Sequence, residues 1–316
     1  MGFFDSAVNL TMVIYIALGL PTVLFNIPFV HLTLFIAKNR GRKEFVTLGC
    51  SALGDIIYVV IYVFNSYWRI QDHPTMISRA ECIGHINILI STFTAVLIFV
   101  NPLMIAIDRL VVSVSGVWYY KQTLTYTVVL FSIPIVVSSI VAGANFYMTS
   151  VSPIEMISSM CFTSGIIQTG GFEWFYYGFK WSCVVLALVV YGVVAIVYWK
   201  KVQIGKCDVV NRVKIQSAYL VMAFNTANAI LLLFVPDVLL KVLTKKSLTL
   251  MTCLFSLMII KLLLNLVGIM LLHKELRTAY LDKVLIFPSW KKRVFGFTSV
   301  VSVSNHAQKN RMTGPN

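Results

Sequence analysis

An acid and a base, Asp108 and Arg109, stand side by side after a long stretch without charge. Residues 82–107 contain no Asp, Glu, Lys or Arg, and this pair is the first to follow. Two interpretations are open. The pair either marks a helix end where charged side chains reach water, or it belongs to a functional surface on which each charge restrains the other.

Four further ionisable side chains lie in apolar surroundings. Asp55, Lys180 and Lys261 each fall inside a long apolar stretch, and Asp237 directly follows Pro236. A charged side chain within a membrane costs on the order of 2.5 to 3.5 kcal/mol, so each needs a partner, a cavity or a route to the surface. We expect Lys180 and Asp237 near the same membrane face, where they form a ligand-facing pair or anchor an acidic ligand. Alternatively, Lys180 extends to the membrane interface.

The composition around these residues is that of a membrane protein. Hydrophobic residues make up 58% of the 316 positions and charged residues 12%, about half the share usual in soluble domains. A spanning helix needs about 20 mainly apolar residues. The sequence predicts an all-α membrane protein, a seven-transmembrane helix bundle with spans at 8–36, 45–67, 83–107, 123–148, 174–199, 215–240 and 248–272.

Positive charge is divided unequally between the two sides of these spans. With the N-terminus outside, 19 of the 26 Lys and Arg residues lie on the cytoplasmic side and 5 lie outside. Because cytoplasmic loops collect positive charge, this predicts a multi-pass plasma-membrane protein with an extracellular N-terminus and a cytoplasmic C-terminus. The net charge of +14 then reflects this bias and attraction to anionic membrane lipid, and no nucleic-acid partner is expected.

Two short motifs near the N-terminus contradict each other. Gly2 with Ser6 fits a myristoylation pattern, whereas Asn9 opens a glycosylation sequon. An extracellular N-terminus is out of reach of cytosolic acylation, so Asn9 is the candidate we retain. No cleavable signal peptide is visible, and we expect the first span to insert by itself.

The cysteines predict one disulfide. Three of the six lie within spans, and a fourth lies in a cytoplasmic, reducing loop. Only Cys82, at the outer start of the third segment, and Cys161, in the second outer loop, share an oxidising compartment. We expect them to be bridged, which would tie a long loop over the bundle.

Four short sequences and one cysteine, on segments one, two, three and seven, occur in an order that is typical of one receptor family. They are "FNIPFV" with Asn26, "LGCSALGD" with Asp55, Cys82 itself, "IDRL" in the place of Asp-Arg-Tyr, and "NLVGI" (265–269) in the place of Asn-Pro-x-x-Tyr. In this arrangement the chain resembles a rhodopsin-like G-protein-coupled receptor over about residues 8–285. "HKEL" with Arg277 resembles that family's short cytoplasmic amphipathic helix, the eighth.

Several positions depart from the family pattern. Leu110, Leu266 and Ile269 replace a tyrosine, a proline and a second tyrosine, and the tryptophan before the proline of segment six is absent. Divergence of this kind resembles the nematode serpentine chemoreceptors, with the Srsx class the nearest. Phe234 stands in the tryptophan position, where it is either a core residue or a switch.

The resemblance bears on the charges at mid-membrane. Asp55 matches the family's sodium-binding carboxylate, and Lys261 lies one turn before Asn265 on the same helix face. We expect the Lys261 ammonium to replace the ion and pair with Asp55; the alternatives are a neutral lysine or one turned toward a ligand cavity. Opsins carry their retinal lysine six residues before the asparagine, where this chain has Ile259, so neither retinal nor another cofactor is expected.

The resemblance also implies a division of roles. A small-molecule or peptide ligand would bind among segments three, five, six and seven and favour a state with splayed cytoplasmic ends. Arg109, released from Asp108, would line the cleft for a heterotrimeric G protein, with Tyr119 at its flank and Asn265 in the same coupling machinery. The ligand-pocket candidates are Lys180, Phe234 and Asp237.

Other classes have less support. The sequence lacks His-x-x-x-His, Gly-x-Ser-x-Gly and glycine-rich phosphate motifs, and its five histidines are scattered, so neither an enzyme nor a metal site is expected. A secondary transporter of a small molecule is the alternative, although its usual internal repeats are not visible. We expect residues 1–7 to be extracellular, 8–285 to form the receptor domain, and 286–316 to form a disordered cytoplasmic tail.

Overall fold

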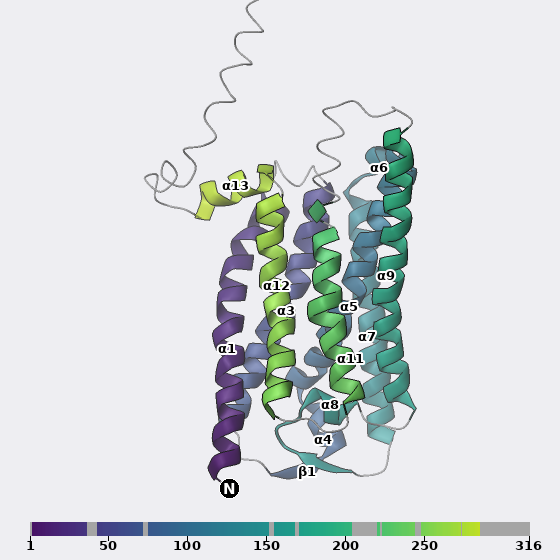
Figure 1. Cartoon of the computed structure of the whole chain (residues 1–316). Helices are drawn as coiled ribbons and strands as arrows, with labels where there is room; N and C mark the ends of the chain where they lie inside the picture. Colours follow the sequence, from purple (N-terminus) through teal and green to yellow (C-terminus); the bar gives the residue numbers. More distant parts are fainter. Residues whose placement is uncertain are drawn as a thin grey trace, which may run out of the picture.

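The chain folds into a bundle of long, roughly parallel and antiparallel helices (Figure 1). The computed structural model describes residues 2–36, 43–71, 75–151, 155–167, 171–203, 220–221, 223–243, 248–272 and 274–284. Within these residues, seven helical spans are long and apolar enough to cross a membrane: Val8–Phe35, Phe45–Gln71, Ile86–Val114, Leu124–Val151, Phe172–Lys200, Ala223–Val242 and Thr249–Leu272. The predicted fold class, an all-α seven-helix membrane protein, is confirmed.

The chain contains long elements that form the spans and short elements that lie at the ends of the bundle. The spans are formed by α1 (Gly2–Val30) with the π-helical turn η1 (His31–Phe35), α3 (Lys43–Gln71), α5 (Ile86–Val114), α7 (Leu124–Val151), α9 (Phe172–Gln203) and α12 (Leu248–Leu272). The sixth span consists of helical residues 223–229, the π-helical turn η2 (Ile230–Phe234) and α11 (Val235–Val242). The short elements are β1 (Met76–Ser78), α4 (Arg79–Gly84), α6 (Gly116–Lys121), β2 (Met156–Ser158), α8 (Thr163–Ile166) and α13 (Lys274–Val284).

The two ends of the bundle differ. One end, here called the hairpin end, holds the N-terminus, α4, α8 and the antiparallel pair β1–β2, in which Ile77 faces Ile157 (Figure 1). The opposite end, here called the α13 end, holds α6 and α13. Since α5 starts beside α4 and ends beside α6, it connects the hairpin end to the α13 end.

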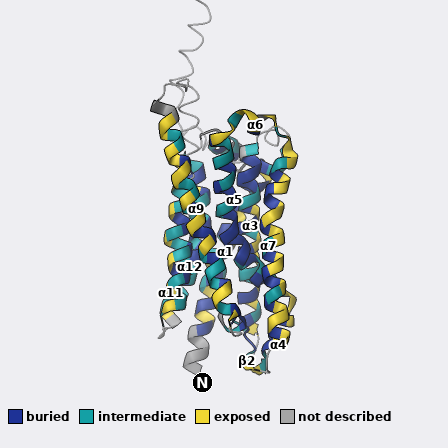
Figure 2. Cartoon of the chain, turned by 90° about the vertical axis from the view of Figure 1, so that its right-hand side faces the viewer, coloured by how far each residue is buried: buried dark blue, intermediate teal, exposed yellow. Residues whose placement is uncertain are grey.

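Helix α5 forms the centre of the packing. It contacts α3, α7 and α9, while α1 packs against α3 and α12. Figure 2 shows exposed residues along the outer faces of α7 and α9 and buried residues toward the middle. The exposed positions on α7 are apolar, among them Val128, Val129, Ile133 and Ile140. An outer surface of this kind needs a lipid environment, because soluble proteins rarely expose large apolar patches.

The third segment differs from the sequence prediction at both ends. Its start is a separate short helix, α4, which holds Cys82 and ends at His85, where the backbone becomes extended. Helix α5 then runs to Val114, beyond the predicted end at 107. The apolar residues Leu110, Val111 and Val112 continue the helix past the charged pair, so Asp108 and Arg109 lie inside a helix. The interpretation of this pair as a water-exposed helix end is wrong.

A short amphipathic helix follows the seventh span, as predicted. In α13, Leu276 and Tyr280 lie one turn apart and are buried, whereas Thr278 between them is exposed. The Tyr280 hydroxyl donates a hydrogen bond of 2.8 Å to the Phe25 carbonyl on α1, and burial raises the pKa of this phenol. This contact holds α13 against the bundle. The predicted tail, 286–316, lies outside the described residues.

Helix packing in the sixth span is shaped by Pro236. A proline has no N–H to donate to the carbonyl four residues earlier, and that carbonyl, of Leu232, lies within the π-helical turn η2. The missing bond and the wider π-helical turn therefore occur at the same place in this span. The predicted start of this span, 215–219, lies outside the described residues.

Candidate functional site

A cavity of about 460 Å³ lies in the hairpin half of the bundle. Its walls come from α3, α5, α9, α11 and α12, together with Ile167 just after α8. Its volume falls within the range of small-molecule sites. The lining is rich in aromatic side chains, namely Tyr58, Tyr62, Phe99, Tyr176, Tyr177 and Phe255.

Lys180 and Asp237 form an ion pair in the wall of this cavity. The Lys180 ammonium lies 2.9 Å from Oδ1 of Asp237, and Nε1 of Trp181 donates a 2.9 Å hydrogen bond to Oδ2. Both charged residues are buried. The ammonium also lies 4.2 Å from the centre of the Phe99 ring and 5.0 Å from that of Tyr176. The structure thus brings the two predicted pocket residues together, and Lys180 does not extend to the interface.

A second ion pair, between Glu173 and Lys241, also joins α9 to α11 at the cavity. Sequence analysis did not identify it, although a signal was present. On α9 the acid and base, Glu173 and Lys180, are seven residues apart. On the neighbouring helix α11, the acid Asp237 likewise precedes the base Lys241, by four residues. Because the two helices run antiparallel, the acid of each lies opposite the base of the other, and two ion pairs form.

Phe234 lies beside the cavity wall. Its ring is 6.4 Å from that of Trp181, in an edge-to-face arrangement. Trp181 in turn donates to Asp237, so Phe234 contacts the ion pair through the indole. Phe234 is not among the side chains that line the cavity.

A second group of polar residues lies at the middle of the bundle. Nζ of Lys261 is 3.8 Å from Oδ1 of Asp55, so the two residues that we expected to pair lie within ion-pair distance. Asn265 lies next to Asp55 and accepts a 3.4 Å hydrogen bond from Asn228. Two cavities of about 30 and 20 Å³ adjoin Asp55 and Asn265. Each is large enough for a water molecule.

Asp108 and Arg109 lie toward the α13 end. Nε of Arg109 is 3.5 Å from Oδ2 of Asp108, and both residues are buried, Asp108 completely. Tyr126 on α7 and Tyr191 on α9 lie close enough to interact electrostatically with this pair. Asn265, which we grouped with this pair from the sequence, lies with Asp55 and Lys261 instead.

Tyr119 on α6 is held at the same end. Its ring is buried, and the Lys43 ammonium lies 4.7 Å from the ring centre and donates to the Tyr119 carbonyl. The ring of Tyr126 packs edge-on against it. Tyr119 therefore connects α6 to the start of α3.

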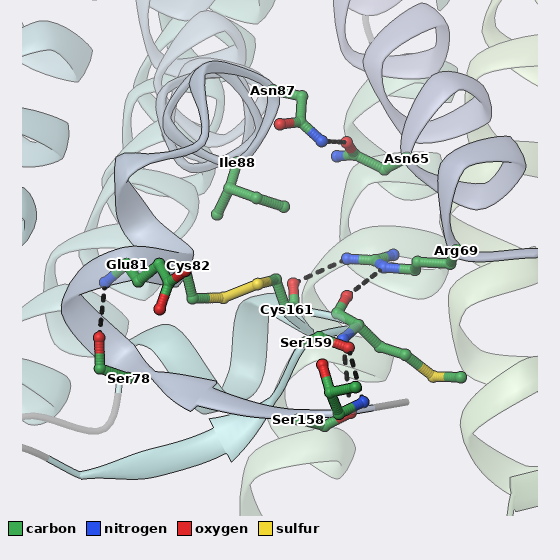
Figure 3. Close-up of a disulfide and its surroundings, with 12 residues drawn as sticks. Asn65, Arg69, Ser78, Glu81, Cys82, Asn87, Ile88, Ser158, Ser159 and Cys161 are labelled. Atoms are coloured by element: carbon green, nitrogen blue, oxygen red, sulfur yellow. Dashed lines mark hydrogen bonds between the residues drawn. A yellow bond between two sulfur atoms is a disulfide. The ribbon is translucent and has the colours of Figure 1, made fainter. Parts of the chain in front are cut away.

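The predicted disulfide between Cys82 and Cys161 is present at the hairpin end (Figure 3). Cys161 has a φ of 47°, a conformation that costs energy for a residue with a side chain. Arg69, buried on α3, donates a 2.7 Å hydrogen bond to the Met160 carbonyl and a 2.9 Å bond to that of Cys161. Its guanidinium lies 4.9 Å from the centre of the Phe162 ring. The disulfide and Arg69 together hold the segment that leads to Ile167 in the cavity wall.

Two asparagines have plainer positions. Asn87 on α5 donates a 2.8 Å hydrogen bond to Asn65 on α3, a cross-helix contact of the kind expected for amides in membrane helices (Figure 3). Asn9 lies on α1 with its side chain exposed. Its glycosylation stays a prediction.

The chain matches no protein-family model, and no curated protein matches it at a significant level. The class of the protein therefore follows from its structure: a seven-helix, multi-pass membrane protein with a small-molecule-sized cavity in one half and a buried acid–base pair toward the opposite end.

Proposed function

We propose that this chain is a rhodopsin-like G-protein-coupled receptor of the nematode serpentine chemoreceptor type. The observation that carries the proposal is the placement of two sites on one central helix. Phe99 of α5 lines the cavity, and Asp108 and Arg109 lie about two and a half turns further along the same helix. A ligand in the cavity and a protein at the α13 end would therefore contact the same helix.

The orientation follows from the charge distribution. The hairpin end, which holds the N-terminus and the disulfide, faces the extracellular space, and the α13 end faces the cytoplasm. The ligand enters from outside or from lipid and binds in the cavity. The outward motion of segment six exposes Arg109 to the G protein, with Tyr119 at the flank of the cleft.

The polar residues at mid-bundle lie between these sites. Asp55, Lys261, Asn228 and Asn265 connect α3, α12 and the sixth span. A ligand that binds one arrangement of these helices more tightly shifts the population toward it, by as much as its affinities for the two arrangements differ.

The test is signalling in cells that report several G-protein pathways. A ligand screen should give responses that depend on the chain, and Arg109→Ala should abolish them at unchanged surface expression. Tyr147→Phe, at an exposed position on α7 toward the hairpin end, is the control. An epitope on the N-terminus should be accessible on intact cells. An intracellular N-terminus, or ligand uptake without a G-protein response, would overturn the proposal.

A further inference from the structure

The cavity in the hairpin half contains equal numbers of acidic and basic side chains. Its charged lining residues are Glu173, Lys180, Asp237 and Lys241. Each is in an ion pair with another member of the same set, and each pair joins α9 to α11. The cavity therefore carries no net formal charge.

The inner pair has little capacity left for a charged ligand. Both carboxylate oxygens of Asp237 already accept a hydrogen bond, one from Lys180 and one from Trp181. The Lys180 ammonium is further covered by aromatic rings, with the ring centres of Phe99, Tyr176 and Tyr177 at 4.2, 5.0 and 5.2 Å. Ring faces attract a cation, so they stabilise the ammonium where it lies.

A ligand with a single charge would have to break one of these pairs. It would gain one partner and leave the other side chain charged and unpaired. That side chain is buried if the Lys180–Asp237 pair is broken and partly exposed if the Glu173–Lys241 pair is broken. Removing one member of a buried pair costs enough free energy to lower an equilibrium constant by a factor of about 100 or more. A ligand without charge leaves both pairs intact.

One residue of the cavity lining carries an unsatisfied polar group. Tyr176 is 1% exposed and lines the cavity, and its hydroxyl has no hydrogen-bond partner among the described residues. A buried hydroxyl without a partner is unfavourable, and a ligand oxygen or nitrogen would satisfy it once the Tyr176 side chain shifts to open the hydroxyl to the cavity. The remaining walls are mainly aromatic and aliphatic, with Ala95, Ile98 and Met258 among them.

We propose that the cavity binds an uncharged small molecule with a mainly apolar or aromatic body and one polar group hydrogen-bonded to the Tyr176 hydroxyl. This inference rests on the proposed receptor function for its meaning, but binding can be measured without a G protein. It also assigns Lys180 a role other than anchoring an acidic ligand: the lysine joins α9 to α11 and forms part of an electrically neutral wall.

The test uses three probes of nearly equal size: 2-phenylethanol, which is neutral, phenylethylamine, which is cationic at pH 7, and phenylacetate, which is anionic. Binding to the full chain in nanodiscs is measured by saturation-transfer NMR. Empty nanodiscs correct for partition into lipid. Ala95→Phe, which fills the cavity, defines the specific signal. We expect 2-phenylethanol to bind at least about tenfold more tightly than either charged probe.

Substitutions should then change the preference in opposite directions. Lys241→Met leaves Glu173 unpaired and should strengthen phenylethylamine binding about tenfold, whereas Glu173→Gln leaves Lys241 unpaired and should do the same for phenylacetate. The effect is modest because this pair is partly exposed, at 17% and 19%. Tyr176→Phe should weaken 2-phenylethanol binding about threefold to tenfold. Tyr147→Phe, at an exposed position on α7, should not.

A wild-type preference for the amine or the acid would overturn the inference. So would the absence of any binding that Ala95→Phe removes. Since no G protein is present, either result leaves the signalling test of the receptor proposal unaffected. Conversely, loss of coupling in Arg109→Ala would leave the charge preference of the cavity unchanged.

Discussion

Replacing Lys261 by methionine should destabilise the bundle by about 3 kcal/mol, because it leaves the Asp55 carboxylate without its cation. The two charged atoms are 3.8 Å apart, and the side chains are 4% and 10% exposed. At an effective dielectric constant of about 20, their attraction is about 4 kcal/mol. Removing one partner of a buried pair costs about 3–5 kcal/mol. We expect the lower value, because the cavity of about 30 Å³ beside Asp55 admits a water molecule.

The measurement is the free energy of unfolding by steric trapping in bicelles, for Lys261→Met, Asp55→Asn and the double variant. If the residues pair, the double variant should be about 2–3 kcal/mol more stable than the sum of the single effects predicts. Lys121→Met, at an exposed position on α6, should change the free energy by less than about 0.5 kcal/mol. Additive single effects would refute the pairing.

Sodium provides an independent measurement of the same pair. With the ammonium beside Asp55, the thermal stability of the wild type should be the same in sodium chloride and in choline chloride. Lys261→Met should become sodium-dependent, since the carboxylate then lacks a cation. A sodium dependence of the wild type that Asp55→Asn abolishes would contradict our assignment of Lys261.

Two further predictions concern the hairpin end. Cys82→Ser opens a disulfide across 79 residues and should lower the free energy of unfolding by about 2–4 kcal/mol, while Cys253→Ser, at a free and exposed cysteine, should leave it unchanged. Arg69→Met removes two charge-assisted hydrogen bonds to the Met160 and Cys161 carbonyls, so amide hydrogen exchange in 156–162 should accelerate at least tenfold; unchanged exchange there would show that Arg69 does not hold this segment.

The sequence predicted the elements well because apolar length is a local property. Each spanning helix satisfies its own backbone hydrogen bonds in lipid, so a run of about 20 apolar residues is enough to identify it. The seventh span was predicted at 248–272, and α12 occupies Leu248–Leu272. Ends were less accurate where charge was taken as the boundary, as at Asp108, because a buried acid–base pair continues a helix without reaching water.

An ion pair within the bundle could be predicted from the sequence only where few charged residues were available to form it. Asp55 and Lys261 were the deep charges of opposite sign, and the family resemblance indicated that they lie close together, so their pairing could be expected while a neutral or cavity-facing lysine stayed open. Lys180 and Asp237 could be placed near one face, where an ion pair was one of several alternatives. The Glu173–Lys241 pair was missed, because neither residue lies deep enough in an apolar run to require a partner.

Sequence alone determined that this protein spans a membrane seven times, which cysteines share a compartment, and which charges must find partners. These conclusions depend on composition and local order, which the chain carries without being folded. The tertiary structure decided that two ion pairs join α9 to α11 and that Arg69 binds backbone carbonyls 91 and 92 positions away. It also decided that the Tyr176 hydroxyl has no hydrogen-bond partner within the part of the chain that the structure describes. Such contacts depend on how helices are rotated against each other, and that rotation is set by packing across the whole bundle.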